Sequence, residues 1–240
     1  MKITTFIRSV FNKLNIDIVR LHNSPEKTLL GLTTKKIDCI LDVGANRGQF
    51  AKYISKIFPR ADIYCFEPLA GPFSTLRDWA DTQNGRVRCF NLALGDEPCE
   101  IQMHLHINHT PSSSILNSTP YGRQVYPQTR AEAIENVKVE TLDRIFLDSD
   151  VPKSKKIMLK LDVQGFEDRV LRGATSLLVD VDVCLLEVCL DPLYESQADF
   201  QDLVMLLYRA GFRYAGNILQ AYGEDGHVIY IDALFTKKGE

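Results

Sequence analysis

The sequence predicts an α/β fold with a doubly wound, mostly parallel sheet and an antiparallel pair of strands at one edge. From residue 37 onward, short apolar runs alternate with longer segments of helical periodicity. Strands that alternate with crossover helices are typical of parallel sheets. The last two apolar runs, 212–219 and 228–237, flank the turn sequence GEDGH, which indicates an antiparallel hairpin.

The expected elements follow in order along the chain. Strands are expected at the apolar runs 37–44, 61–68, 87–94, 155–163 and 181–188. Helices are expected at 49–58, 71–83, 166–178 and 198–212, the last ending at Gly211. Residues 99–108 alternate like an exposed strand. Residues 108–136 are polar and interrupted by proline, which indicates a long loop.

Length and composition favour one domain. A chain of 240 residues, 45% of them hydrophobic, can bury a full core as one globular unit. We expect this domain over residues 37–240, with an inserted strand and loop at about 98–136. Residues 1–36 then form an N-terminal helix and linker.

The N-terminal segment has the pattern of a basic amphipathic helix. Its apolar residues recur at helical spacing, and its basic residues Lys2, Arg8 and Lys13 lie off that stripe. The apolar stripe consists of Ile3, Phe6, Ile7, Val10, Phe11 and Leu14. We expect this helix to pack on the main domain or on a second subunit of a dimer. Contact with a membrane surface is the alternative.

Charge and cysteine usage exclude several classes of protein. A net charge of −3 and a pI near 6.0 argue against nucleic acid as a partner. No apolar run approaches the ~20 residues of a membrane-spanning helix, and charged residues interrupt the N-terminus before a signal-peptide core forms. The six cysteines form no C-x-x-C pair, which favours buried thiols in a reducing cytosol. The sequence therefore predicts a soluble, cytoplasmic protein.

The loop DVGANRG follows the first predicted strand, where open α/β sheets bind their ligands. Gly44 and Gly48 let the backbone approach a ligand closely, but their spacing is not the G-x-G-x-x-G of a dinucleotide site. Asp42 would repel a pyrophosphate and attract an amino group, while Glu67 can accept hydrogen bonds from ribose hydroxyls. This set suits S-adenosylmethionine. The alternative is that the glycines close a turn and Glu67 caps a loop.

Several motifs in order resemble the FkbM family of S-adenosylmethionine-dependent methyltransferases, from about residue 37 to the end. They are ILDVGANRGQF, CFEP, NLALGD, SSSIL, VETLD, KLDVQGFEDRVLRGA, LLEV and DALF. The resemblance implies a Rossmann-like class I methyltransferase sheet. It also implies that Glu67 binds the ribose of the cofactor and that Leu92 and Ala93 contact the adenine. The loop on the methionine side would be formed by Asp42, Gly44, Ala45, Asn46 and Gly48. The family's K-x-D-x-x-G-x-E stands here as Lys160, Asp162, Gly165 and Glu167, with Gln164 where a glutamate is usual.

Methyl transfer to an alcohol needs a group that helps the hydroxyl lose its proton. Asp162 ends the fourth core strand on the ligand side, so it is the first candidate for a base or metal ligand. The alternative is a salt bridge with Lys160, which shares its face of the strand. Glu187, at the end of the next strand, is a further catalytic candidate. Glu167 lies in a first helical turn, where stabilising the helix dipole is the alternative to a functional role.

The inserted segment holds two more candidate groups. His104, His106 and His109 form an H-x-H-x-x-H cluster, but no nearby carboxylate or cysteine completes a metal site, so no metal ligands are assigned. The serines Ser112, Ser113 and Ser114 are candidates for binding a polyhydroxylated acceptor. As a mobile lid, this segment would select the acceptor.

Together these features predict an O-methyltransferase that acts on a hydroxyl, with a sugar of a polysaccharide, glycolipid or glycosylated natural product as the expected acceptor. The acceptor class comes from the family resemblance. Two alternatives stay open: a nicotinamide-dependent oxidoreductase, and a binding module of the same fold without turnover. The sequence does not determine the acceptor, the need for a divalent metal or the oligomeric state.

Overall fold

The computed structural model describes residues 20–147 and 156–238, with a few residues before them (Ile7, Val10, Phe11, Lys13, Leu14 and Ile16). Most of the predicted N-terminal helix therefore lies outside the described residues. The described members of its apolar stripe, Ile7, Val10, Phe11 and Leu14, have exposed side chains. In the described part of the chain, no helix is long and apolar enough to cross a membrane.

Seven strands form the main sheet in the order β3-β2-β1-β7-β8-β10-β9. The strands β3, β2, β1, β7 and β8 are parallel, and β10 pairs antiparallel with both β8 and β9. Their bounds are Cys39–Val43 (β1), Asp62–Phe66 (β2), Val87–Phe90 (β3), Ile157–Leu161 (β7), Val181–Cys189 (β8), Phe212–Tyr222 (β9) and Val228–Lys237 (β10). This arrangement confirms the predicted doubly wound sheet with an antiparallel pair at one edge.

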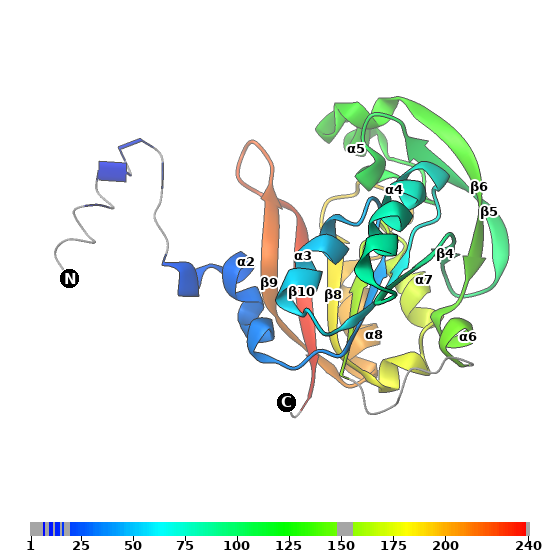
Figure 1. Ribbon diagram of the computed structural model, residues 1–240. Helices are drawn as coiled ribbons and strands as arrows, with labels where there is room; N and C mark the ends of the chain where they lie inside the picture. The colour runs from blue at the N-terminus through cyan, green and yellow to red at the C-terminus, as the bar shows by residue number, and fades with distance from the viewer. Residues whose placement is uncertain are drawn as a thin grey trace.

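Helices cover both faces of this sheet (Figure 1). Around Ile40 and Met158, one face packs against η2 (Leu29–Thr34), α3 (Gln49–Ile57) and α4 (Ala70–Ala80). Around Leu159 and Leu186, the opposite face packs against α7 (Glu167–Arg172), η6 (Leu177–Val179) and α8 (Phe200–Arg209). Shorter elements are η1 (Leu21–Asn23), α2 (Pro25–Thr28), η3 (Asp81–Gln83) and α6 (Leu142–Leu147). Every residue of β1 and β7 is buried, as expected for strands covered on both faces.

Two predicted elements are divided in the structure. The predicted helix 166–178 ends at Arg172, and η6 begins separately because the Asp143 carboxylate accepts hydrogen bonds from the backbone N–H groups of Ser176 and Leu177. The predicted strand 87–94 stops at Phe90, and residues 93 and 94 form β4 (Ala93–Leu94) in a second sheet.

The second sheet has the strand order β4-β6-β5, with β5 at Cys99–His106 and β6 at Glu132–Glu140. The predicted long loop over 108–136 is therefore wrong. The segment contains η4 (Thr110–Ser112), α5 (Pro120–Val125), η5 (Pro127–Arg130) and the first half of β6. Pro120 opens α5, where proline is tolerated, and the Thr119 hydroxyl accepts a hydrogen bond from the Gly122 N–H at 2.9 Å. Proline and polar residues marked a helix start here rather than a loop.

The cysteines follow the prediction in part. All six lie among the described residues, and none of them is joined in a disulfide. Cys39, Cys65, Cys184 and Cys189 are buried as expected, but Cys89 is half-buried and Cys99 is exposed. Cys99 is exposed because it begins β5, whose first two residues lie at the surface.

Candidate active site

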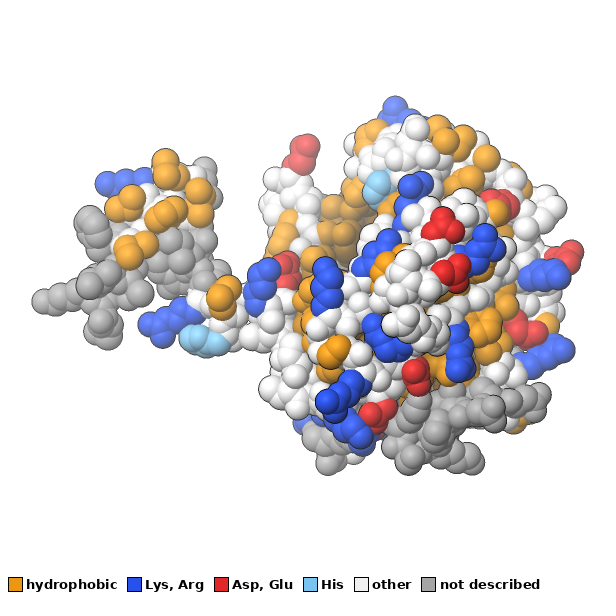
Figure 2. Space-filling view, in the orientation of Figure 1, with side chains coloured by type: hydrophobic (Ala, Val, Ile, Leu, Met, Phe, Trp, Pro, Cys, Tyr) orange, Lys and Arg blue, Asp and Glu red, His pale blue; other side chains and the backbone are white. Residues whose placement is uncertain are grey.

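A pocket of about 520 Å³ opens at the carboxyl ends of the parallel strands. Ten of the predicted site residues line it: Gly44, Ala45, Asn46, Glu67, Leu92, Ala93, Ser113, Lys160, Asp162 and Glu187. On the β9 side, Ile218 and Leu219 complete the wall. In Figure 2 the molecule is hollowed beside the β9–β10 hairpin, and hydrophobic side chains lie within the hollow. The volume and the largely apolar wall are typical of small-molecule sites.

The loop after β1 packs directly on the end of β7. Gly44 has φ +76°, and a Cβ atom there would lie 1.8 Å from the carbonyl oxygen of Asp162. The N–H groups of Gly44 and Ala45 both donate to the carbonyl oxygen of Phe66 at 3.0 Å. Glycine is needed because a side chain would separate the two loops. The ends of β1, β2 and β7 thereby meet in one place.

Glu67 connects two loops of the pocket wall. Its Oε2 accepts a hydrogen bond from the Asn46 N–H at 2.9 Å, and its Oε1 accepts one from the Leu69 N–H at 2.8 Å. Burial raises the pKa of Glu67 to about 7, against these hydrogen bonds, which lower it. Glu67 therefore caps both loops, as the alternative interpretation expected, and also lines the pocket. Its role as ribose ligand stays a prediction.

Lys160 lies at the centre of an ion-pair network. Its Nζ is 3.2 Å from Asp42 Oδ1 and 3.2 Å from Asp162 Oδ2, and it donates to the carbonyl oxygen of Gly44 at 3.3 Å. Burial alone would lower the pKa of Lys160, but the two carboxylates raise it above its usual value. The salt bridge considered for Asp162 is present, and it leaves Asp162 in the pocket wall.

Asp42 and Gly48 are not among the described residues that line the pocket. The Asp42 side chain is fully buried, and burial raises its pKa. Gly48 has φ +83° and directly precedes α3. Asp42 therefore acts on the pocket through Lys160, while Gly48 sets the start of the helix that follows the loop.

Two further carboxylates stand near Asp162. Burial, followed by the charges of Asp162 and Asp232, raises the pKa of Glu187 well above its ordinary value. Asp232 on β10 lies directly opposite Glu187 on β8 and also lines the pocket, and burial raises its pKa to about 6. Sequence reasoning missed Asp232. The motifs LLEV and DALF contained the signal, but the pairing of the two strands was needed to align them.

Glu167 has a local structural role. Its Oε1 accepts hydrogen bonds from the N–H groups of Val163 and Gly165, at 3.1 and 3.2 Å. Burial raises its pKa to about 7. Glu167 thus shapes the 163–165 loop that follows β7, beyond any effect on the helix dipole.

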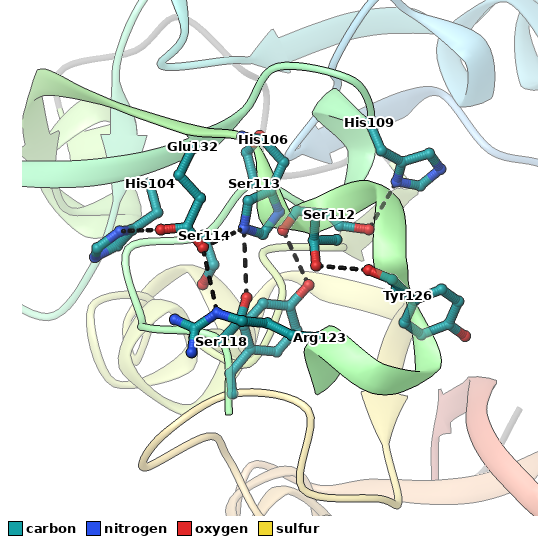
Figure 3. A network of polar contacts seen from close by, with 12 residues as sticks. His104, His106, His109, Ser112, Ser113, Ser114, Ser118, Arg123, Tyr126 and Glu132 are labelled. Atoms are coloured by element: carbon teal, nitrogen blue, oxygen red, sulfur yellow. Dashed lines mark hydrogen bonds and ion pairs between the residues drawn. The ribbon is translucent and has the colours of Figure 1, made fainter. Parts of the chain in front are cut away.

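The histidine cluster lies on the second sheet (Figure 3). His104 Nδ1 and His106 Nε2 lie 3.6 and 3.4 Å from the two carboxylate oxygens of Glu132, so both side chains share one side of β5 as expected. Sequence reasoning missed this carboxylate, because Glu132 belongs to β6, where the sequence had suggested a loop. Arg123 also contacts Glu132, at 3.7 Å. Among the described residues, no group of three or more His, Cys, Asp or Glu side chains could hold a metal ion.

The three serines are buried and bonded within the chain. Ser112 Oγ contacts His109 Nδ1 at 2.8 Å, Ser113 Oγ accepts from the His106 N–H at 3.0 Å, and Ser114 Oγ donates to the Gln164 carbonyl oxygen at 2.7 Å. Figure 3 shows the three side chains within this network. Acceptor binding by these hydroxyls stays a prediction, and it would require some of these bonds to be exchanged.

Other pocket residues had no role in the sequence interpretation. Phe50 and Tyr53 come from α3, and Glu26 comes from α2. Thr110 lines the pocket, and its hydroxyl lies 3.2 Å from both side-chain polar atoms of Asn46. The inserted segment therefore contacts the predicted cofactor loop as well as the outer pocket.

Comparison with known families identifies the chain. A model of the methyltransferase FkbM domain matches residues 42–214. The chain belongs to the FkbM methyltransferase family. Together with the sheet order, this membership makes it an S-adenosylmethionine-dependent methyltransferase with a class I fold and excludes the nicotinamide-dependent alternative.

Relatives of this chain include three proteins that are named as methyltransferases. Methyltransferase 1 of Beauveria bassiana is 29% identical over 187 residues, covering 73% of this chain and 72% of the relative. The hexuronic acid methyltransferase AglP of Haloferax volcanii is 27% identical, covering 72% of this chain but only 62% of AglP, so this chain spans less than two thirds of that relative. The 2-O-methyltransferase NoeI of Sinorhizobium fredii is 24% identical, covering 75% of each chain.

Solved structures similar to this FkbM-family chain are distant. Magnesium protoporphyrin IX methyltransferase from Synechocystis, solved with bound S-adenosylmethionine, has a TM-score of 0.48 at 10% identity and covers 99% of this chain and 98% of that chain. A putative rRNA methylase from Clostridium thermocellum has a TM-score of 0.49 at 9% identity and covers 93% and 99%.

The pocket fits the cofactor of the family. Leu92, Leu94 and Met103 form an apolar wall suited to a purine ring. Glu67 keeps lone pairs on a buried carboxylate beside this wall, which suits ribose hydroxyls. Gly44 lines the pocket and has no side chain, so its backbone can approach the amino acid part of a ligand.

Proposed function

We propose that this methyltransferase transfers the methyl group to a hydroxyl oxygen of a sugar, within a glycan or a glycosylated small molecule. One observation carries the proposal. The carboxylates of Asp162, Glu187 and Asp232 gather in the wall of the cofactor pocket, within reach of one buried lysine, Lys160. An oxygen acceptor needs such a base, since an alcohol is a weak nucleophile until its proton is removed.

Asp162 is the first candidate for this base. Its Oδ2 pairs with Lys160 and its Oδ1 accepts a hydrogen bond from Gln164, which fixes the plane of the carboxylate and leaves further lone pairs free. When bound, S-adenosylmethionine supplies an electrophilic methyl group. Asp162 would accept the proton of the acceptor hydroxyl, and Lys160 would keep the carboxylate in place.

Glu187 and Lys160 would assist rather than accept the first proton. The raised pKa of Glu187 favours its protonated form beside Asp162, since neighbouring carboxylates do not readily all ionise. Glu187 would then donate a hydrogen bond to a second hydroxyl of the acceptor. Lys160 is already shared between Asp42 and Asp162.

A sugar fits the rest of the pocket. The aromatic rings of Phe50 and Tyr53 can pack against the apolar face of a sugar ring. The carboxylates of Asp232 and Glu26 can accept hydrogen bonds from sugar hydroxyls. Two of the relatives are named for methylating a hexuronic acid or a 2-O position, which supports a sugar hydroxyl as the acceptor.

The test is a screen of nucleotide sugars and glycan fragments with S-adenosylmethionine labelled in its methyl group. Once an acceptor is found, Asp162→Asn should lower kcat by roughly 10²- to 10⁴-fold, because the base is lost while size and most hydrogen bonding are kept. Affinity for S-adenosylhomocysteine should change little. EDTA should leave the wild-type rate unchanged, because no step assigned to the side chains needs a metal.

Three outcomes contradict parts of this proposal. Transfer to a nitrogen or carbon atom would overturn the acceptor class. Asp162→Asn activity within a few-fold of wild type would make Asp162 a structural partner of Lys160 and leave Glu187 as the candidate. Tight cofactor binding without transfer to any acceptor would support a binding module instead.

A further inference from the structure

Gln164 is held in a backbone conformation that its side chain does not favour. Its φ is 56°, in the left-handed region, and the residue is buried. Such a conformation is strained for a residue other than glycine and persists only where surrounding contacts fix it. One of those contacts is the Ser114 hydroxyl, which donates to the Gln164 carbonyl oxygen at 2.7 Å. The loop after β7 is thereby tied to the inserted segment.

The side-chain amide of Gln164 matches its three partners in hydrogen-bonding character. Nε2 donates to Asp162 Oδ1 at 2.7 Å and also donates to Glu187 Oε1. The amide oxygen accepts a hydrogen bond from the Tyr194 hydroxyl at 2.6 Å. Both N–H bonds point at carboxylates and the carbonyl faces a donor, so each polar atom of the amide has a partner.

We propose that Gln164 is a positioning residue for methyl transfer: its amide bridges Asp162 and Glu187 and fixes their spacing at the reacting end of the pocket, while Tyr194 orients the amide. The inference rests on the proposed function, because it takes Asp162 as the base. The inference extends that function, because the ionisation of Asp162 and Glu187 then depends on a neutral hydrogen-bond donor at position 164.

The electrostatic surroundings of Gln164 in this chain favour a neutral donor over a carboxylate. The amide contacts Asp162, Glu187 and the Tyr194 hydroxyl. The described titratable groups that interact electrostatically with these three are mostly acidic: Asp42, Glu167, Cys189, Asp232 and the hydroxyls of Tyr126 and Tyr230. Lys160 is the cation that contacts Asp162. An added carboxylate here would face two others within hydrogen-bond distance.

The substitution Gln164→Glu isolates this effect, because it preserves the shape and replaces the N–H donors by oxygen. Two hydrogen bonds become contacts between acceptors, which are tolerable only when the cluster holds an extra proton. The pKa of a carboxyl in the folded variant is then raised above its unfolded value. Its stability should therefore fall as pH rises, because the folded state must release that proton.

Thermal unfolding of the whole chain between pH 5 and pH 8 measures this directly. The difference in melting temperature between Gln164→Glu and wild type should be roughly 5 to 10 °C larger at pH 8 than at pH 5, with the variant less stable, because its folded state must release the extra proton. Gln102→Glu is the matched control, since Gln102 is exposed on β5 opposite Asn136. The control should show almost no such pH dependence.

A swap variant tests the pairing itself. In Gln164→Glu combined with Glu187→Gln, an amide again donates to a carboxylate, so much of the melting temperature lost at pH 8 should return. Equal pH dependence in Gln164→Glu and the Gln102→Glu control would overturn the proposal. So would a single variant that is unfolded at pH 5 as well and is not rescued by the swap.

The pH profile of methyl transfer adds a functional readout. With a known acceptor, Gln164→Glu should move the acidic limb of the kcat profile upward by at least about one pH unit, because Asp162 loses a donor and gains a like charge. A uniform loss of kcat without a shift would reduce Gln164 to a structural role and refute the positioning role. If no acceptor is ever methylated, the proposed function fails, while the unfolding experiments still decide whether the amide bridges the two carboxylates.

Discussion

Replacing Glu67 by alanine removes one carboxylate that caps two loops and faces the cofactor pocket. The Asn46 and Leu69 N–H groups, now at 2.9 and 2.8 Å from its oxygens, would lose their acceptor. Each buried amide left unpaired costs about 1 to 3 kcal/mol of stability. If Glu67 also accepts from the ribose, S-adenosylhomocysteine binding should weaken by a further ~1.5 to 3 kcal/mol, or roughly 10- to 150-fold in Kd.

The two effects separate in a calorimetric titration with two ligands. S-adenosylhomocysteine and its 2′,3′-dideoxy analogue are each titrated into wild type and Glu67→Ala, and folding is checked by denaturant unfolding. If Glu67 holds the ribose, removing the hydroxyls should weaken binding strongly in wild type and only slightly in the variant. The difference between the two losses is the coupling between Glu67 and the hydroxyls.

Two results would refute this reasoning. A folded Glu67→Ala protein with unchanged affinity for S-adenosylhomocysteine would remove the ribose assignment. An equal loss for the dideoxy analogue in both proteins would leave Glu67 as a loop cap alone.

Three further predictions follow from individual contacts. Burial raises the pKa of Glu67 from an ordinary value near 4.5 to about 7. The contribution of Glu67 to the free energy of unfolding should therefore fall by about 3 kcal/mol as the pH rises across that range. Denaturant titrations at several pH values should show this fall in wild type and not in Glu67→Gln. Gly44→Ala should prevent folding or abolish S-adenosylhomocysteine binding, seen by thermal unfolding with and without ligand, because its Cβ would lie 1.8 Å from the Asp162 carbonyl oxygen. Thr110→Val should weaken S-adenosylhomocysteine binding by about 1 kcal/mol in calorimetry, because it removes the contact with Asn46; full affinity would show that the inserted segment does not support the cofactor loop.

The Thr110 contact also changes the expectation for the inserted segment. Its sequence indicated a mobile lid that selects the acceptor. In the structure Thr110 and Ser113 line the pocket, and Ser114 bonds to the loop after β7. Shortening the segment should therefore weaken cofactor binding along with methyl transfer.

Sequence reasoning was reliable for the parallel core and weak for the insertion. Strands such as β1 and β7 are buried on both faces, so they read as continuous apolar runs that periodicity finds easily. Strand β6 alternates exposed and partly buried residues over its first half, and α5 is a short helix that begins at Pro120, so neither has a strong local signal. The same weakness hid Glu132 from the histidine analysis.

The positions of Gly44, Glu67 and Asp162 at strand ends were readable because parallel strands end at one edge of a sheet. The salt bridge between Asp162 and Lys160 was also readable, because the two residues share one face at the end of β7. Most other bonding partners were not. Asp42 forms an ion pair with Lys160, and Asp232 lies opposite Glu187 in the β8–β10 pair. The Gln164 side chain forms hydrogen bonds with residues of three separate segments. Periodicity along the chain reports which face of an element is buried. Hydrogen bonds between residues 20 or more positions apart depend on strand register and loop packing, which arise only when the whole domain has folded.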